Sequence, residues 1–378
     1  MSFWRRRLVA LAVLAGVALA VAALASGGTG SAGRGRHAGL PGATATASAS
    51  QGVLPADLDR AAARLMLVGF SGTDGRAAFF DRLRRTEWGG VVLERSNYVA
   101  PAQLLALTQR LQAVALAAGH VAPIVAAMQL GGDDSAFPGL PPGPQAGVAS
   151  AADAGAQAAA AGRRLRALGV GLDLGPSADL GASAGAWAGR AYSDQAPVVT
   201  ALVRAAVAGY RRAGVATAVG HFPGEGGASR DPQAGPATVG LSLGDLRGAD
   251  LEPFGAVART TPAVQMSGAM YAAWDGVTPA TLLPGAIALL RRQGFRGAVV
   301  SADLNAVTAV TGGSPAQAAV EALKAGCDLL YVPGDAADQE AARRAVADAI
   351  RRGDVGAGRV RDALVHAATL RREIAGGL

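Results

Sequence analysis

The residue types best suited to chemistry occur in short polar segments that follow apolar runs. One such segment, "VGHFPGEGGASRDPQAGP" at residues 219–236, carries His221, Glu225 and Asp231 among glycines and prolines. An imidazole and carboxylates are the groups most used for general acid–base catalysis. Glycine and proline are typical of a loop that folds tightly around a ligand. The segment therefore has the residues to bind a polar ligand and to move a proton.

Three further segments carry candidate residues. "GPSADL" contains Asp179, "GRAYSDQAP" contains Arg190 and "SADLNAV" contains Asp303. Each has a less specific interpretation: Asp179 could cap a rim, and Arg190 could form a surface ion pair. "QLGGDDSAFPGLP" adds the pair Asp133–Asp134, but no histidine lies nearby, so we expect no metal site there.

The elements that position these residues alternate between two patterns. Short apolar runs indicate buried parallel strands, and Ala/Leu/Arg stretches between them have helical spacing. Eight alternations favour a single-domain (β/α)8 TIM barrel over an open, doubly wound sheet with six. The expected strands are 66–70, 90–93, 123–128, 170–174, 215–219, 263–267, 298–303 and 328–332, and the expected helices include 101–118, 151–168, 196–213, 279–293 and 314–326. In a barrel, the loops after the strands meet at one rim, which would bring the candidate residues together.

The N-terminus has the features of an export segment. Arg5, Arg6 and Arg7 precede an uncharged run over residues 8–25, which is typical of a signal peptide or a membrane anchor. Residues 26–52 are rich in Gly, Ala, Ser and Thr, as in a flexible linker. We therefore expect a signal or anchor at 1–25, a linker at 26–52 and the barrel at 53–378, exported and either secreted or membrane-anchored.

Charge and cysteine content exclude several classes of protein. The net charge is +7, but the first 52 residues hold five arginines and no acid, which leaves 30 basic against 28 acidic residues in the remainder. This near balance, without a basic stripe interleaved with aromatics, argues against nucleic-acid binding. The single cysteine, Cys327, cannot form an internal disulfide or a cysteine metal cluster.

Several motifs taken together resemble a known family. "GHFPGEG", "GRAYSDQAP", "TPATLLPGAIALLRRQGFRGAVVSADL" and "ALKAGCDLLYVPG" are similar, in order from about residue 55 to 375, to the N-terminal barrel of glycoside hydrolase family 3. The resemblance is to its bacterial β-N-acetylhexosaminidases. It implies retaining hydrolysis of N-acetylglucosaminides by an Asp nucleophile and a His–Asp pair on a mobile loop, without a cofactor or a metal.

The resemblance fails at the position of the nucleophile. The family places an Asp directly after Ser or Thr at the end of the seventh strand, but Ser301 is followed here by Ala302. A methyl group cannot attack a sugar. Asp303 comes next, and alternation along a strand would turn it to the opposite face unless a bulge re-aimed it. Asp303 is therefore a remnant candidate only.

Other family positions are also changed. The family pattern is Lys-His-Phe-Pro-Gly-His-Gly, followed by Asp-Ser-His. Gln233 replaces the proton-transferring His, and a carboxamide has no titratable proton near neutral pH. Gly220 replaces the sugar-binding Lys, and Pro232 stiffens the loop. The Asp and Glu expected after the third strand are Met128 and Leu130.

Two functions follow from these residues. The first is a catalytically impaired or inactive barrel that binds an N-acetylglucosamine-containing glycan, a peptidoglycan fragment or a protein partner. The second is an active hexosaminidase that uses a retaining or altered mechanism, with Asp303 as a substitute nucleophile or with Asp231 or Glu225 as acid–base groups. Arg190, His221 and Asp179 are the expected sugar-binding residues, and Trp187, Tyr192 and Trp274 either stack on a sugar or pack over the barrel mouth.

Overall fold

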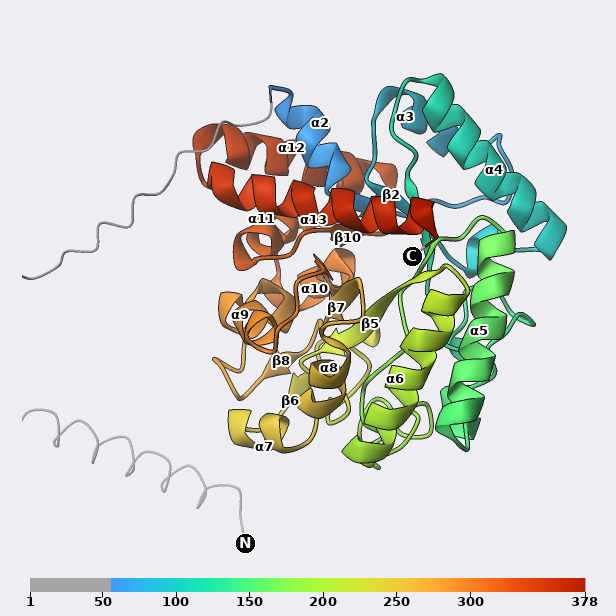
Figure 1. The fold of residues 1–378 in the computed structure, drawn as a ribbon. Coiled ribbons are helices and arrows are strands. Elements are labelled where there is room, and N and C mark those ends of the chain that lie inside the picture. Colours follow the sequence, from blue (N-terminus) through green and yellow to red (C-terminus); the bar gives the residue numbers. More distant parts are fainter. Residues whose placement is uncertain (1–55, 378) are drawn as a thin grey trace, which may run out of the picture. The chain divides into compact units, whose positions relative to one another are not determined.

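Eight parallel strands form a sheet that closes on itself (Figure 1). The structure is a computed structural model and describes residues 56–377. The strands follow one another in sequence order, the last strand pairs with the first, and a parallel bridge between Val300 and Leu329 completes the ring. The predicted (β/α)8 barrel is confirmed, and the open sheet is excluded. The strands are β1 (Met66–Val68), β2 (Gly90–Leu93), β3 (Ile124–Ala127), β4 (Leu172–Asp173), β5 (Ala216–Phe222), β7 (Ala263–Met266), β9 (Ala298–Val300) and β10 (Leu330–Val332).

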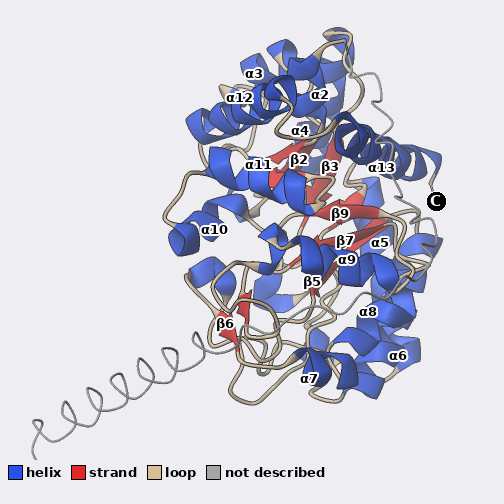
Figure 2. Cartoon of the chain, turned by 90° about the vertical axis from the view of Figure 1, so that its left-hand side faces the viewer, coloured by secondary structure: helices blue, strands red, loops and turns tan. Residues whose placement is uncertain are grey.

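Helices surround the strands on the outside (Figure 2). Several begin where the sequence provides a start signal, for example proline in the first turn of α9 and a serine cap before α5 and α11. They are α2 (Leu58–Arg64), α3 (Phe79–Arg85), α4 (Pro101–Ala117), α5 (Ala151–Ala167), α6 (Ala196–Arg212), α7 (Leu243–Gly248), α8 (Leu251–Val257), α9 (Pro284–Arg292), α10 (Leu304–Thr311), α11 (Pro315–Ala325), α12 (Ala336–Arg352) and α13 (Ala357–Gly376).

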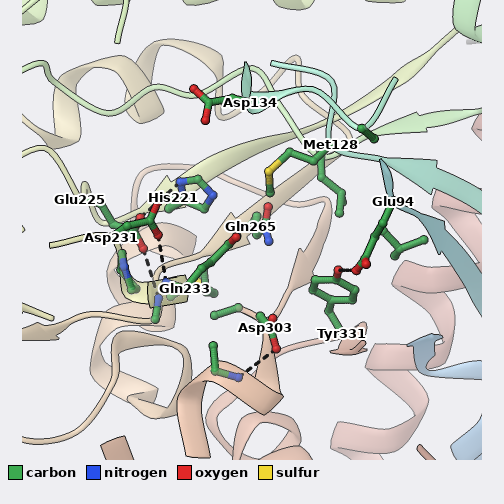
Figure 3. A pocket seen from close by; sticks show the side chains of 18 of the residues that line it. Glu94, Met128, Asp134, His221, Glu225, Asp231, Gln233, Gln265, Asp303 and Tyr331 are labelled. Carbon is green, nitrogen blue, oxygen red and sulfur yellow. Dashed lines mark hydrogen bonds and ion pairs between the residues drawn. The ribbon is translucent and has the colours of Figure 1, made fainter. Parts of the chain in front are cut away.

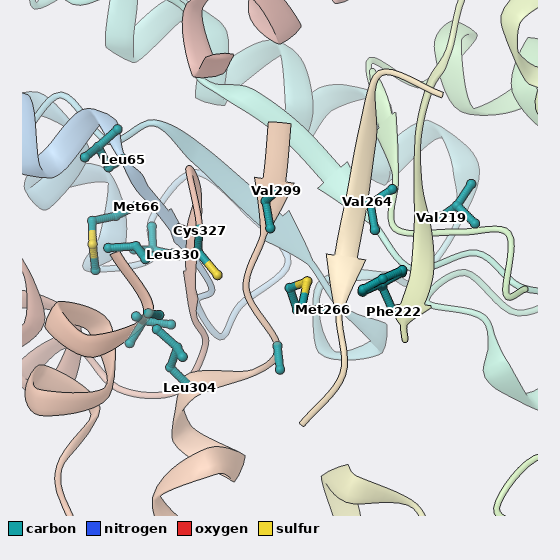
Figure 4. Close-up of a cluster of buried hydrophobic side chains, with 14 of the residues drawn as sticks. Leu65, Met66, Val219, Phe222, Val264, Met266, Val299, Leu304, Cys327 and Leu330 are labelled. Carbon is teal, nitrogen blue, oxygen red and sulfur yellow. The ribbon is translucent and has the colours of Figure 1, made fainter. Parts of the chain in front are cut away.

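Side chains alternate between two apolar layers along the strands. In β1, Leu67 belongs to the cluster inside the barrel, whereas Met66 and Val68 belong to the cluster between strands and helices. Figure 4 shows part of this outer cluster, in which the thiol of Cys327 is also buried. The alternation is the two-residue period of a strand, and it explains why continuous apolar runs mark these strands.

The C-terminal helix closes one end of the barrel. Ala367, Leu370 and Ile374 of α13 pack against the inner cluster. Gly171 permits this approach, because a Cβ there would lie 2.4 Å from the Ile374 side chain. In the described residues, α13 thus covers this end of the barrel, and the carboxyl ends of the strands lie at the opposite end.

Several local features differ from the sequence-based prediction, and several strands, such as β9 and β4, are shorter than expected. The helix expected over 279–293 begins only at Pro284, because a separate 3-10 turn (Ala280–Leu282) precedes it. A small two-stranded parallel sheet, β6 (Thr238–Val239) with β8 (Met270–Tyr271), was not predicted. It holds the loop after β5 against the loop after β7.

The predicted signal or anchor (1–25) and linker (26–52) lie outside the described residues. Between residues 56 and 377, no helix combines the length and apolar character needed to cross a membrane.

Candidate ligand-binding and active site

A cavity of about 410 Å³ opens at the carboxyl ends of the strands. Its walls come from the loops that follow β2, β3, β4, β5, β7 and β9, together with Tyr331 of β10 (Figure 3). Met128, Leu174 and Met266 contribute apolar surface. Of the sequence-predicted residues, five line it: Arg190, His221, Glu225, Asp231 and Asp303. Asp179 does not line the cavity but lies behind His221.

One wall is a hydrogen-bonded network around His221. β5 extends to Phe222, with a register shift after Val219, and this extension brings His221 to the cavity. Asp179 is fully buried and accepts the Nδ1 proton of His221 at 2.9 Å. It also accepts the backbone N–H groups of His221 at 3.1 Å and Glu225 at 2.6 Å. Asp179 therefore fixes the imidazole orientation and the start of the loop together.

Electrostatics keep a proton in this network. Burial alone would lower the pKa of His221, but the carboxylates of Glu225 and Asp179 outweigh it and raise that pKa to about 9. Burial raises the pKa of Glu225, and the positive charge of His221 opposes that rise. The Glu225 carboxylate lies 3.5 Å from His221 Nδ1 and 3.5 Å from the Trp187 indole nitrogen. At neutral pH the network is therefore a charged imidazolium between buried acids.

Arg190 joins three loops at the mouth of the cavity. Its guanidinium binds Asp134 through two hydrogen bonds of 2.7 and 3.0 Å, and Asp231 through one of 2.9 Å. It also lies 4.3 Å from the centre of the Trp187 ring. A fork-shaped guanidinium suits such bridging geometry. Arg190 thus forms an ion pair, as its less specific interpretation predicted, while still lining the cavity.

The aromatic side chains pack against protein groups. The Trp187 ring contacts both Arg190 and, at 5.4 Å between centroids, His221. Tyr192 is in a separate pocket, and Trp274 packs against Tyr271. Of these three predicted aromatics, only Trp187 reaches the cavity, and its contacts favour packing over the stacking of a sugar.

The opposite wall holds Asp303 together with three residues that the sequence analysis did not select. We call Glu94, Gln265, Asp303 and Tyr331 the acceptor wall. The Tyr331 hydroxyl donates to Glu94 at 3.1 Å, and Gln265 is buried beside them. A signal existed, because a polar residue facing inward near the carboxyl end of a barrel strand is typical of a site. The apolar runs around these residues predict core strands, and such runs alone do not indicate which side chains face inward.

Known proteins match both this sequence and this fold. The sequence model of the glycosyl hydrolase family 3 N-terminal domain matches residues 58–370. The chain belongs to glycoside hydrolase family 3.

Among curated relatives, the beta-hexosaminidase of Methylococcus capsulatus is 33% identical over 258 residues, covering 65% of this chain and 75% of the relative. That of Xylella fastidiosa is 34% identical over 286 residues, covering 71% of this chain and 83% of the relative.

Solved structures agree. A family 3 beta-N-acetylglucosaminidase from a Paenibacillus species superposes with a TM-score of 0.80 at 29% identity, over 84% of this chain and 63% of that one. A beta-N-acetylhexosaminidase from Beutenbergia cavernae superposes with a TM-score of 0.75 at 27% identity, over 84% of this chain and 99% of that one.

The position at which the family resemblance places the nucleophile lies on the cavity surface. Ala302 lines the cavity with 6% of its surface exposed, and its backbone N–H donates to Thr281. The expectation that Asp303 points to the opposite face is wrong: β9 ends at Val300, so strand alternation does not apply, and Asp303 lines the cavity as well. One oxygen of Asp303 caps α10 by accepting the N–H groups of Asn305 and Ala306.

The remaining changed family 3 positions lie in or beside the cavity. Gln233 and Met128 line it, and Asp231 caps the short turn that contains Gln233. At Gly220, a Cβ would meet only the Gln265 side chain, at 3.6 and 3.7 Å, which is ordinary contact. The backbone at 220 therefore has room for a Cβ and does not itself require glycine.

One group of side chains among the described residues has the spacing of metal ligands: Asp179, His221 and Glu225. Their possible ligand atoms lie within 4.8 Å of one another. Both oxygens of Asp179 already accept hydrogen bonds, including one of 2.8 Å from Ser177. A cation would have to displace these donors, so hydrogen bonding accounts for the cluster.

Proposed function

We propose that this family 3 protein binds an N-acetylglucosamine-containing glycan, such as a peptidoglycan fragment, without hydrolysing it by the retaining mechanism. The observation that carries the proposal is Ala302. An intact cavity surrounds it, but its methyl group stands where a nucleophile would have to attack the sugar. Removing a nucleophile lowers kcat by several orders of magnitude.

The change at the loop after β5 supports the same function. Gln233 lines the cavity without a proton to transfer, so the group that would assist the leaving oxygen is absent together with the nucleophile. The cavity itself, of about 410 Å³, has the size of a small-ligand site. The names of the relatives point to N-acetylglucosaminides as the ligand class.

A second candidate function is hydrolysis by an altered mechanism. It is favoured by the presence of two carboxyl groups, Asp303 and Glu225, on different walls of one cavity. Burial raises the pKa of each, as a general acid requires. Glu225 is, however, paired with His221, and Asp303 is engaged as a helix cap.

For localisation, we propose that the N-terminal segment exports the barrel, which then acts outside the cytoplasm, either secreted or anchored. Fractionation of cells that express the full chain, with and without residues 8–25, tests this. Recovery of the full chain in the cytoplasm would contradict it.

The functional test combines binding with turnover. Full-length protein is titrated with N-acetylglucosamine trisaccharide by calorimetry and incubated with a chromogenic N-acetylglucosaminide. We expect saturable binding and no hydrolysis. Arg190→Met should weaken binding, and Arg292→Met, on exposed α9 surface, serves as the matched control. Turnover that Asp303→Ala or Glu225→Ala abolishes would establish the second candidate, and a protein partner becomes the alternative if no glycan binds.

A further inference from the structure

The cavity carries more negative than positive side chains. Six carboxylates line it, from Glu94, Asp133, Asp134, Glu225, Asp231 and Asp303, against the cationic groups of Arg95, Arg190 and His221. Arg190 is paired with Asp134 and Asp231, and His221 lies against Glu225 and Asp179. These ion pairs leave neither cation available to the other wall.

The excess charge is on the acceptor wall. Neither Glu94 nor Asp303 forms an ion pair with any residue between 56 and 377. Burial raises the pKa of Asp303, and the nearby charge of Glu94 raises it further. Arg95 donates instead to the backbone carbonyls of Asp133 and Ser135, at 3.1 and 3.4 Å. The two carboxylates therefore face the cavity without a counter-charge.

Gln265 provides a second, independent indication of a ligand. Its side chain is 2% exposed, yet its Oε1 accepts no hydrogen bond from the described residues. Figure 3 shows it between the His221 wall and Glu94. A buried carbonyl oxygen without a donor is unfavourable. Rotation of the Gln265 amide toward the cavity, which this residue lines, would let a ligand supply the missing donor.

We propose that the acceptor wall binds a protonated amine, and that the sugar held in this cavity is glucosamine with a free amino group rather than N-acetylglucosamine. This inference rests on the proposed glycan-binding function and specifies the sugar. An ammonium group offers three donors and one positive charge, which match two carboxylates and an unpaired amide oxygen.

The acetylated sugar fits this wall less well. Its amide offers one N–H and no charge, and its methyl group would displace water from Glu94 and Asp303 without neutralising them. Desolvating a carboxylate without a partner is unfavourable. A glycan that contains both sugar forms would therefore place its unacetylated residue in the cavity.

The test is a calorimetric titration of the full chain with glucosamine trisaccharide and with N-acetylglucosamine trisaccharide at pH 6.5. We expect the unacetylated sugar to bind at least tenfold more tightly. Glu94→Gln and Asp303→Asn should each reduce that preference about tenfold. Asn still caps α10, so the second variant removes charge with little effect on the helix. Glu252→Gln, an exposed acid on α8, is the charge-matched control and should keep the preference.

The outcomes separate the two proposals. Equal or tighter binding of the acetylated sugar overturns the amine site but leaves glycan binding intact. If neither sugar binds, glycan binding itself is wrong. The assignment of the wall to an amino sugar is overturned if the preference survives both acceptor-wall variants. It is also overturned if a linear diamine binds as tightly as the glucosamine trisaccharide.

Discussion

The buried Asp179 should control both the protonation of His221 and the stability of the barrel rim. Replacing it by asparagine keeps its size but removes the negative charge 2.9 Å from His221 Nδ1. Charges about 4 Å apart attract by roughly 4 kcal/mol at an effective dielectric constant of about 20. We therefore expect Asp179→Asn to return the pKa of His221 from about 9 to its ordinary value of 6.5 or below.

The same change has a consequence for stability that depends on pH. Because the pKa of His221 is higher in the folded chain than in the unfolded chain, the network stabilises the fold fully below pH 6.5. That contribution is lost as the pH rises through 9. At about 1.4 kcal/mol per pH unit, the contribution is roughly 3 kcal/mol. Asp179→Asn should thus destabilise the protein by about 3 kcal/mol at pH 6 and by less at pH 9.5.

Two measurements check this prediction. The chain has four histidines, so their ring signals can be followed individually by NMR across a pH titration. Urea unfolding at pH 6 and 9.5 gives the stability. Asp194→Asn, in an exposed loop, is the matched control and should change neither. If His221 of the unsubstituted protein titrates near or below 6.5, burial outweighs the carboxylates and the reasoning is refuted.

Three further outcomes are expected. The unsubstituted protein should not turn over a chromogenic N-acetylglucosaminide. The triple variant Ala302→Asp/Gln233→His/Gly220→Lys should turn it over weakly at best, because the rate effects of catalytic groups that act together are not additive. Rapid turnover by the unsubstituted chain would contradict this. Gln265→Met should raise the unfolding temperature of the unliganded protein, because it removes a buried oxygen without a donor; a lower temperature would indicate an overlooked hydrogen bond. Burial raises the pKa of Asp173 to about 7, so the stability of the fold falls as the pH rises through 7. In urea unfolding, Asp173→Asn should therefore be more stable than the unsubstituted protein at pH 8 but not at pH 4.

The barrel could be predicted because its strands are buried on both faces and stand out as apolar runs. The boundaries were less predictable where local chemistry decides them. Pro284 starts α9 five residues after the expected position, since the preceding residues form their own turn. Likewise, β9 ends before Ser301, and both Ala302 and Asp303 line the cavity.

The candidate site was predictable where loop motifs mark it and not where strands contribute. Glu225, Asp231 and Arg190 lie in glycine-rich loops, and His221 lies near the end of β5, just before one of them. The structure brings these four residues to one cavity. Which of them bind sugar stays a prediction. Gln265 and Glu94, by contrast, occur within or directly after apolar runs, where a polar residue is hard to distinguish from a tolerated exception. Their proximity depends on the barrel closing, which local sequence does not encode.

Closure of the ring also determines when the protein can fold during its synthesis. The first strand needs the last one, since Met66 pairs with Leu330, and α13 covers the barrel interior only after that. A growing chain that ends before β10 leaves β1 and β9 as unpaired edges, which are templates for association with other chains. The nascent chain must therefore be kept from aggregating until β10 has been made, and the segment from β10 through α13 is as necessary for solubility as for the shape of the cavity.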